Sequence, residues 1–230
     1  MNVSFGGSGF LLAFHVGVAK HLQRVGRLTQ QSCVAGASGG ALVAAAIACK
    51  VPLVQVEERL RLSAQAMKSS SEKSLRDHVF GHVMTVFPDD LPSPLRLIVA
   101  TTEVWPNPGR IVHHSHFQSK EDLANIVVAS CHIPFYLTTN FALRYQDTWY
   151  IDGCVRSLVP KVPNHVGVNV FPLPEFLSSP NTISPNLLGA AFPFKLAQLV
   201  EYSLVPPGDE TLNELVHWGE EAAKVYLKQQ

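Results

Sequence analysis

Near the N-terminus, two short apolar segments each end in a glycine-rich turn, and a helical pattern follows each turn. The first segment, Asn2–Phe5, leads into Gly6-Gly7-Ser8-Gly9, and the second, Ser32–Ala35, leads into Gly36-Ala37-Ser38-Gly39-Gly40. After the second turn, Ala41–Cys49 is apolar throughout, as expected of a buried helix. Two strand–turn–helix units in succession are typical of a parallel sheet with helices packed against it.

The rest of the chain continues this alternation. Further strands are predicted at Leu95–Thr101, Gly109–Ser115, Thr148–Ile151 and Gly167–Phe171. The predicted helices, besides Ala41–Cys49, are Phe10–Val25, Pro52–Met67, Leu75–Phe87, Glu121–Ser130, Leu187–Leu204 and Thr211–Leu227. We therefore predict an α/β fold, a three-layer α/β/α sandwich with a mostly parallel central sheet.

Two polar stretches are predicted to lie outside helices and strands. Lys68–Lys73 has the composition of a loop, and Pro172–Pro185, which is rich in Pro, Ser and Asn, has that of a linker. We assign residues 1–176 to the main domain and residues 177–230 to a C-terminal helical extension that packs on the same domain.

The chain carries few charges, which argues against some classes of function. Its 18 basic and 18 acidic side chains cancel, and only 16% of its residues are charged, against about 25% in ordinary soluble domains. A nucleic-acid-binding surface needs a basic excess or a basic stripe, so no nucleic-acid partner is expected. The low charge indicates either an unusually large buried fraction or apolar surface that is left uncovered.

Cysteine spacing and hydropathy predict an intracellular, cytoplasmic protein with reduced thiols and no membrane-spanning helix. The four cysteines form no CxxC pair, and the longest near-apolar run, Ala41–Cys49, is shorter than the roughly 18 residues of a membrane span. Histidines gather in two places, but no cysteine or carboxylate joins either group in a ligand pattern; they are His113, His114, His116, His78 and His82. No metal and no cofactor is therefore predicted.

The second turn has the form G-x-S-x-G, in which Gly36 and Gly40 flank Ser38. Between a buried strand and a helix, this pattern is typical of the sharp turn that exposes a nucleophilic serine in acyl-transfer enzymes. The glycines permit backbone angles that a β-carbon would hinder, and the helix N-terminus favours negative charge. The motif alone leaves two alternatives open: a phosphate-binding turn, and a helix start with Ser38 as its N-cap.

The turn at Gly6, Gly7, Ser8 and Gly9 can complete such a site. If the first two strands are parallel neighbours, both turns lie at one edge of the sheet, and N–H groups of the first turn can hold an oxyanion beside Ser38. A nucleotide-binding loop is disfavoured, because the chain has Leu12 where a third glycine is needed and no lysine at the Walker position.

Asp152 is the best-placed acid, because it follows the predicted strand Thr148–Ile151 and precedes Gly153. A carboxylate at a strand end can project into a site at the edge of the sheet. The alternative is a turn-forming Asp-Gly pair of the kind common in hairpins.

In this order, the segments resemble the patatin-like phospholipases, and most closely the adiponutrin-type branch of animal lipid hydrolases. The resemblance spans roughly Asn2 to Phe176 and rests on Ser4–Leu11 with His15 and Gly17, Gly36–Ala41, Ala129–Tyr136 and Trp149–Gly153. An α/β-hydrolase is disfavoured, because only 35 residues precede Gly36, which leaves room for a single βαβ unit.

The resemblance implies a patatin-like catalytic domain at 1–176 that hydrolyses acyl esters of phospholipids or acylglycerols without a cofactor. Ser38 would be the nucleophile, Asp152 the base, and Gly6, Gly7, Ser8 and Gly9 the oxyanion hole. The partner would be a lipid ester, with peripheral contact to a membrane or lipid-droplet surface. The alternative is a catalytically weak lipid-binding or regulatory protein that keeps the fold, and hydrolysis is not separated from acyl transfer.

Overall fold

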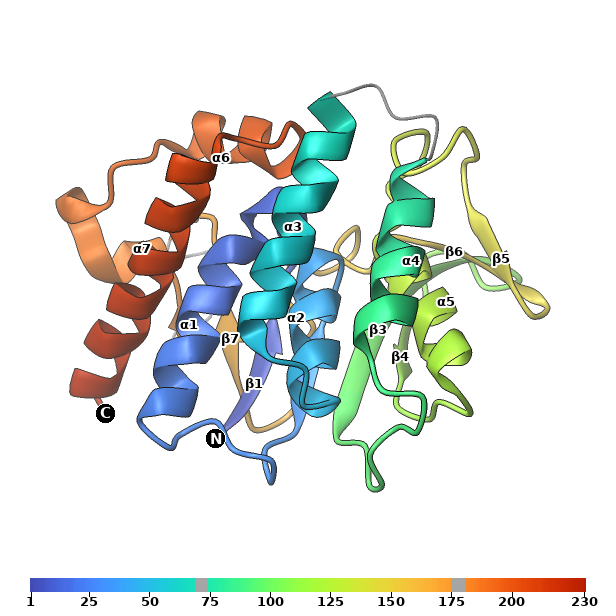
Figure 1. Cartoon of the computed structure of the whole chain (residues 1–230), viewed down its shortest axis with the longest axis horizontal. Helices are drawn as coiled ribbons and strands as arrows, with labels where there is room; N and C mark the ends of the chain where they lie inside the picture. Colours follow the sequence, from blue (N-terminus) through green and yellow to red (C-terminus); the bar gives the residue numbers. More distant parts are fainter. Residues whose placement is uncertain (69–73, 175–180) are drawn as a thin grey trace.

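A computed structural model describes residues 1–68, 74–174 and 181–230 (Figure 1). These residues form one eight-stranded sheet in the order β5-β6-β3-β2-β1-β7-β8, with β4 paired to β3. The strands are β1 (Asn2–Phe5), β2 (Val34–Gly36), β3 (Leu97–Trp105), β4 (Ile111–His114), β5 (Leu143–Tyr145), β6 (Thr148–Ile151), β7 (His165–Val168) and β8 (Thr182–Ile183). Five of the predicted loop residues, 69–73, and residues 175–180 of the predicted linker lie outside the described part.

Helices surround this sheet, as Figure 1 shows. The α-helices are α1 (Leu12–Arg24), α2 (Gly39–Ala48), α3 (Leu53–Lys68), α4 (Leu75–Val86), α5 (Lys120–Ser130), α6 (Leu196–Leu204) and α7 (Asp209–Lys228), with 3-10 helices η1 (Gly9–Leu11) and η3 (Pro185–Ala191). Neighbouring pairs among β3, β2, β1, β7 and β8 are parallel, whereas β4, β6 and β5 pair antiparallel. The predicted α/β class with a mostly parallel central sheet is confirmed.

The central strands are buried on both faces, which explains why they are almost free of charge. In β1, Val3 and Phe5 are fully buried and belong to the main hydrophobic core. Ser4 points to the opposite face, because side chains alternate along a strand. There its hydroxyl donates a hydrogen bond to the carbonyl oxygen of Pro160 at 2.7 Å, so a loop covers this part of the second face.

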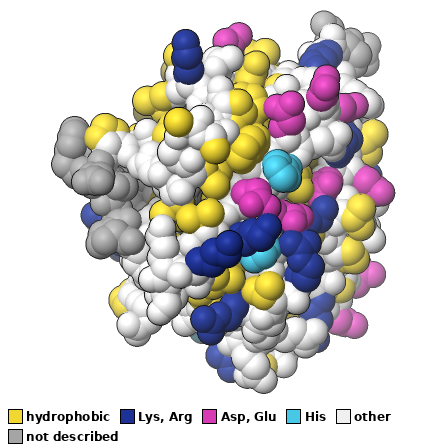
Figure 2. All heavy atoms as spheres, turned by 90° about the vertical axis from the view of Figure 1, so that its left-hand side faces the viewer, with side chains coloured by type: hydrophobic (Ala, Val, Ile, Leu, Met, Phe, Trp, Pro, Cys, Tyr) yellow, Lys and Arg dark blue, Asp and Glu magenta, His cyan; other side chains and the backbone are white. Residues whose placement is uncertain are grey.

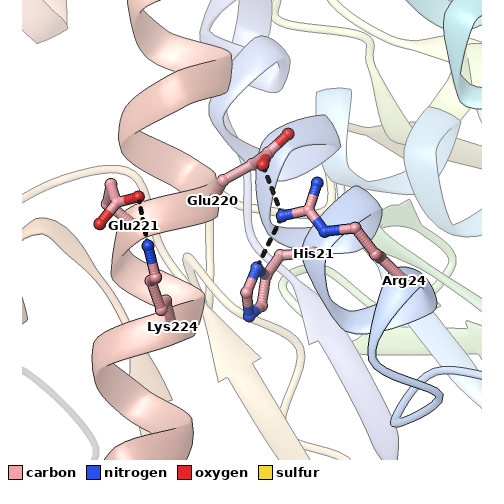
Figure 3. A network of polar contacts seen from close by, with 5 residues as sticks. All are labelled: His21, Arg24, Glu220, Glu221 and Lys224. Atoms are coloured by element: carbon pink, nitrogen blue, oxygen red, sulfur yellow. Dashed lines mark hydrogen bonds and ion pairs between the residues drawn. The ribbon is translucent and has the colours of Figure 1, made fainter.

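The C-terminal helix α7 packs closely along α1. A β-carbon on Gly17 of α1 would lie 1.9 Å from the carbonyl oxygen of Val216, and one on Gly219 of α7 would lie 2.1 Å from that of Phe14. Figure 3 shows the polar contacts at this boundary, where Arg24 donates to Glu220 at 2.8 Å. The helices therefore meet backbone against backbone, while the domain boundary at residue 176 stays a prediction.

Three elements differ from the prediction. The strand β5 was missed, because its hairpin turn with β6, Gln146-Asp147, lacks the usual Asn-Gly or Asp-Gly signature, and Gln146 itself takes φ 52°. The predicted linker contains β8, whose two residues are too few to show an alternating pattern. The predicted helix Leu187–Leu204 is divided into η3 and α6, since Gly189 has φ 55° and Pro193 follows.

Candidate active site

Ser38 lies in the sharp turn between β2 and α2, with φ 54° and ψ −133°. This backbone conformation is rare for a residue with a β-carbon and persists only where neighbours hold it. The Ser38 N–H donates to Ser130 Oγ at 2.9 Å, and the Ser130 hydroxyl donates to the Ala100 carbonyl at 2.7 Å. Ser38 occupies the N-cap position of α2, but its side chain makes no capping hydrogen bond. The hydroxyl is therefore not used to hold the helix end.

The glycines of this turn are required by close backbone contacts. A β-carbon on Gly36 would lie 2.3 Å from the carbonyl oxygen of Gly40, inside the turn itself. A β-carbon on Gly40 would lie 2.4 Å from the carbonyl oxygen of Gly6. The start of α2 thus rests directly on the first glycine-rich turn, and the predicted meeting of the two turns at one edge of the sheet is observed.

Asp152 is fully buried beyond the end of β6. Its N–H donates to the His132 carbonyl at 2.8 Å, and its Oδ1 accepts the N–H of Cys154 at 2.8 Å. Its Oδ2 is buried and accepts no hydrogen bond within the standard distance from any residue that the structure describes. Burial raises the pKa of the Asp152 carboxyl, while hydrogen bonding by the Cys154 N–H and thiol and by the Ser38 hydroxyl opposes the rise. The structure therefore brings Asp152 and Ser38 together.

Asp152 reaches Ser38 from the end of an antiparallel strand. The strand β6 is antiparallel to β3, with Ile151 opposite Thr102, so the chain approaches from beyond the ends of the parallel strands. The next residue, Gly153, sits so close to β3 that a β-carbon would lie 2.1 Å from the Ala100 carbonyl oxygen and 3.2 Å from Ala37 Cβ. The position of Asp152 therefore depends on Gly153, because a larger residue there would prevent the contact with β3.

The first turn presents only some of its N–H groups to the site. The N–H of Gly6 donates to the Val168 carbonyl at 2.9 Å, and that of Gly7 donates to the Leu158 carbonyl at 2.8 Å. Within the described ranges, the N–H groups of Ser8 and Gly9 have no such partner. The buried Ser8 hydroxyl also lacks a partner there. Gly6 and Gly7 therefore hold the turn in place, while Ser8 and Gly9 keep free donors.

Gly39, which directly follows Ser38, supplies a third free N–H among the described residues. A β-carbon on Gly39 would lie 2.6 Å from Ser8 Oγ and 3.1 Å from Gly9 N, so the donors of the two turns are neighbours. Gly39 is not among the site residues predicted from the sequence. The signal was present, because the residue after an elbow serine commonly provides an oxyanion donor.

Two further residues support the first turn from either side. His15 is fully buried, and its Nε2 is 3.0 Å from the Gly6 carbonyl oxygen, to which it donates. Burial lowers the pKa of His15 to about 4, so the ring is neutral at pH 7. Cys154 lies against Gly7, where an added β-carbon would be 2.5 Å from Cys154 Cβ. His15 holds the turn by its hydrogen bond to Gly6, and Cys154 packs against the turn at Gly7.

A largely apolar pocket begins at these turns and runs between α2, α3 and α4. Ser38, Gly9 and Gly39 line it together with core residues such as Leu42 and Val83, and it encloses about 870 Å³ of empty space including its open mouth. Within the described ranges, no cluster of His, Cys, Asp or Glu side chains has the arrangement of a metal site. In the same part of the chain, no helix combines the length and the apolar character that crossing a bilayer requires.

Comparison with known proteins identifies relatives of the chain. The family model of the patatin-like phospholipases matches residues 3–161. A rat patatin-like phospholipase domain-containing protein 2 (Rattus norvegicus) is 28% identical over 95% of the chain, and a mouse 1-acylglycerol-3-phosphate O-acyltransferase (Mus musculus) is 28% identical over 74%. The human patatin-like phospholipase domain-containing protein 4 (Homo sapiens) is 27% identical over the whole chain.

The chain spans 49% of the rat protein and 43% of the mouse protein, but 97% of human protein 4. The crystal structure of VipD from Legionella pneumophila shares the fold at a TM-score of 0.55 and 12% identity, over 98% of this chain and 66% of VipD. The predicted resemblance, including its adiponutrin-type animal branch, is confirmed. The match to the family model covers more than half of the residues, and the chain belongs to the patatin-like phospholipase family.

Proposed function

We propose that this protein hydrolyses acyl esters of lipids with Ser38 as nucleophile and Asp152 as base. The observation that carries the proposal is the buried carboxyl of Asp152 beside Ser38, whose backbone is held in a strained turn at one end of an apolar pocket. Family membership at about 28% identity supports a lipid ester hydrolase without fixing its substrate.

In the proposed mechanism, Asp152 takes the proton from Ser38 as Oγ forms a bond to the ester carbonyl carbon. The bond from that carbon to the alcohol oxygen then breaks, and the alcohol leaves with the proton held by Asp152. A water molecule then gives a proton to Asp152 as its oxygen bonds to the acyl carbon. The bond from that carbon to Ser38 Oγ breaks, the fatty acid leaves, and Asp152 returns the proton to Oγ, which restores the Ser38 hydroxyl. One carboxyl group thus serves both half-reactions.

The negative charge on the carbonyl oxygen needs preorganised donors at the moment of attack. The oxyanion hole was predicted at Gly6, Gly7, Ser8 and Gly9. Only N–H groups without a hydrogen-bond partner can bind the oxyanion, which excludes those of Gly6 and Gly7. The free N–H groups belong to Ser8 and Gly9 in the first turn, together with Gly39 after the nucleophile. Gly6 and Gly7 support the hole by fixing the turn through their bonds to β7 and the loop at Leu158.

A lipid panel tests the proposed reaction. We expect the wild-type protein to release fatty acid from a phospholipid or an acylglycerol, and Ser38→Ala to release none above the uncatalysed rate. Ser115→Ala, which changes an exposed serine elsewhere, is the matched control and should behave as wild type. Equal release by wild type and Ser38→Ala on every lipid would show that the proposal is wrong.

Acyl transfer is the second candidate, because one relative is named as a 1-acylglycerol-3-phosphate O-acyltransferase. An alcohol acceptor could replace water in the second half-reaction without any change in the roles of Ser38 and Asp152. Adding such an acceptor to the lipid panel separates the two, since transfer yields a new ester at the expense of free fatty acid.

The raised pKa of Asp152 predicts the pH profile of the reaction. The base must be ionised, so kcat/KM should fall as the pH drops through the pKa of Asp152. Because burial shifts this pKa upward, the fall should occur at a higher pH than the region of about pH 4 in which an exposed carboxyl titrates. Steady-state kinetics from pH 4 to 9, with circular dichroism to confirm folding, measures this. A profile that stays flat down to about pH 4 contradicts the assignment.

We further propose that α6 contacts the surface of a membrane or lipid droplet. Leu196, Val200 and Leu204 recur every four residues on α6 and are 41%, 50% and 37% exposed. Figure 2, which faces the left-hand side of Figure 1, shows hydrophobic side chains in its upper half, above a group of charged ones. The end of α6 adjoins the first turn, because a β-carbon on Gly9 would lie 1.9 Å from the Ser203 carbonyl oxygen. Lipid bound there would enter the pocket directly.

Replacing Val200 by glutamate should weaken binding to phosphatidylcholine vesicles by about tenfold, because the charge would have to enter an apolar phase. Hydrolysis of a soluble short-chain ester should be unchanged. Val25→Glu is the control, since Val25 is 46% exposed at the opposite end of α1 from the first turn. Equal loss of vesicle binding in both variants, measured by co-sedimentation, would contradict a specific role for α6.

A further inference from the structure

The apolar pocket contains one stripe of polar side chains that the proposed mechanism does not use. Gln55, Arg59 and Ser63 recur every four residues on α3, and all three line the pocket. His82 of α4 lines it as well, and its Nδ1 is 3.3 Å from Ser63 Oγ, which joins the two helices. Apolar side chains surround this group, among them Leu60, Val79 and Val83.

Arg59 is the charged member of this stripe, and it has no counter-ion. It is half-buried, and no hydrogen bond or ion pair joins it to any residue that the structure describes. Its neighbour Arg61, on another face of α3, donates to Asn213 at 2.5 Å and lies 4.0 Å from Asp209. Of these two arginines on one helix, only Arg61 has hydrogen-bonding and charged partners within the described part of the protein.

The charges around Arg59 leave its positive charge uncompensated. No aspartate or glutamate is among the described residues that line the pocket. Burial lowers the pKa of His82 to about 4, with further lowering by Arg59 and His78, so this ring is neutral at pH 7. Glu57, on the same helix, is paired with Lys20. A half-buried cation facing an apolar space gains most from an anionic ligand.

We propose that Gln55, Arg59, Ser63 and His82 form a subsite for the anionic head group of a single-chain lipid, whose chain lies against the apolar wall. The guanidinium group would hold a carboxylate or a phosphate monoester through paired hydrogen bonds, and the amide and hydroxyl of the stripe would add further ones. The inference rests on the proposed lipid function of this pocket, but it does not require turnover.

Two lipids share this head-group chemistry. A free fatty acid carries a carboxylate and is the product of the proposed hydrolysis, so the subsite would retain product. A lysophospholipid with a terminal phosphate carries a phosphate monoester, and in that case the subsite would select substrate. Dodecanoate and dodecyl phosphate represent the two sources, and uncharged dodecanol has the same chain without the charge.

The test uses the full chain with Ser38→Ala, so that binding is measured without reaction. Displacement of Nile red, an uncharged apolar dye, gives the Kd of each of the three ligands. We expect at least one anion to bind about tenfold more tightly than dodecanol, a difference of about 1.4 kcal/mol. Arg59→Gln should remove this preference and leave dodecanol binding unchanged, while Arg59→Lys should keep part of it. Arg61→Gln is the matched control and should keep all of it.

The anion that binds more tightly identifies the head group. Equal binding of both anions and dodecanol, or equal loss of the anion preference in Arg59→Gln and Arg61→Gln, overturns the proposal. If Arg59→Gln also fails to bind dodecanol, its binding defect is general and the Arg59→Lys variant decides. An Arg59→Lys protein that binds dodecanol normally but shows no preference for the anions overturns the proposal. Hydrolysis in the lipid panel without any anion preference would reject the subsite alone. An Arg59-dependent preference without hydrolysis would reject the proposed reaction alone.

Discussion

Replacing Asp152 by asparagine, or Ser38 by alanine, should lower kcat/KM for ester hydrolysis by at least about a thousandfold. The alanine variant has no oxygen to form the acyl-enzyme. The asparagine variant keeps the shape of Asp152 and can still accept the Cys154 N–H at Oδ1, but it cannot take the Ser38 proton. The losses should not add in the double variant, because both residues act in one step.

The folded state should survive these two substitutions. A buried carboxyl whose pKa is raised by folding costs stability at high pH. This cost is absent below the pKa of the unfolded chain, about 4, grows as the pH rises to the pKa of the folded state, and is fully present above it. The asparagine side chain carries no charge, so Asp152→Asn should melt no lower than wild type at pH 8. Thermal unfolding followed by circular dichroism provides this control. Turnover within about tenfold of wild type in a folded Asp152→Asn protein would remove Asp152 from the mechanism.

The second large effect concerns the contact between α1 and α7. Gly17→Ala should destabilise the protein by about 3 kcal/mol and lower its Tm by roughly 5–10 °C. The added methyl group would lie 1.9 Å from the Val216 carbonyl oxygen and 2.8 Å from its carbon. Both atoms belong to the backbone of α7, so the strain can be relieved only by moving a whole helix.

Gly81→Ala is the matched control, because Gly81 also lies within a helix, α4, and nothing lies within 4 Å of the position of its β-carbon. Alanine there should stabilise the protein by about 0.5–1 kcal/mol through its higher helix propensity. Differential scanning calorimetry of both variants makes the comparison. Similar melting temperatures for Gly17→Ala and wild type would mean that α7 is not held against α1 as described.

The elements that could be predicted are those whose own residues carry a clear sequence pattern. The strands and helices around Ser38 follow from short apolar segments that end in glycine turns, and the sheet order brings these turns together. The strand β8 and the hairpin of β5 have no such local signal, since β8 is two residues long and the turn at Gln146 lacks glycine. Their formation depends on the neighbouring strands that pair with them.

In the candidate site, too, some features could be predicted from sequence motifs and others could not. Ser38 and Asp152 were predicted from motifs, but the state of the N–H groups in the first turn was not. Gly6 and Gly7 donate hydrogen bonds to Val168 and Leu158, which lie more than 150 residues away in the chain and belong to no motif. The spacing of Gln55, Arg59 and Ser63 is equally uninformative by itself, because polar residues four apart are typical of a solvated helix face. Only packing shows that this face lines a pocket.

The low charge of the chain now has two structural causes. The central strands are buried on both faces, and part of the remaining apolar surface lies exposed on α6 at the end that adjoins the first turn. The sequence composition alone could not separate buried from exposed apolar residues.

Covalent labelling tests the central claim most directly. A fluorophosphonate with an alkyl chain reacts with an activated serine, forming a bond from Oγ to phosphorus with loss of fluoride. Peptide mass mapping should find one adduct in the wild-type protein, on Ser38, with labelling absent in Ser38→Ala and strongly slowed in Asp152→Asn. An active protein that carries the adduct on another residue, or that labels equally fast without the Asp152 carboxylate, would contradict the Ser38–Asp152 mechanism.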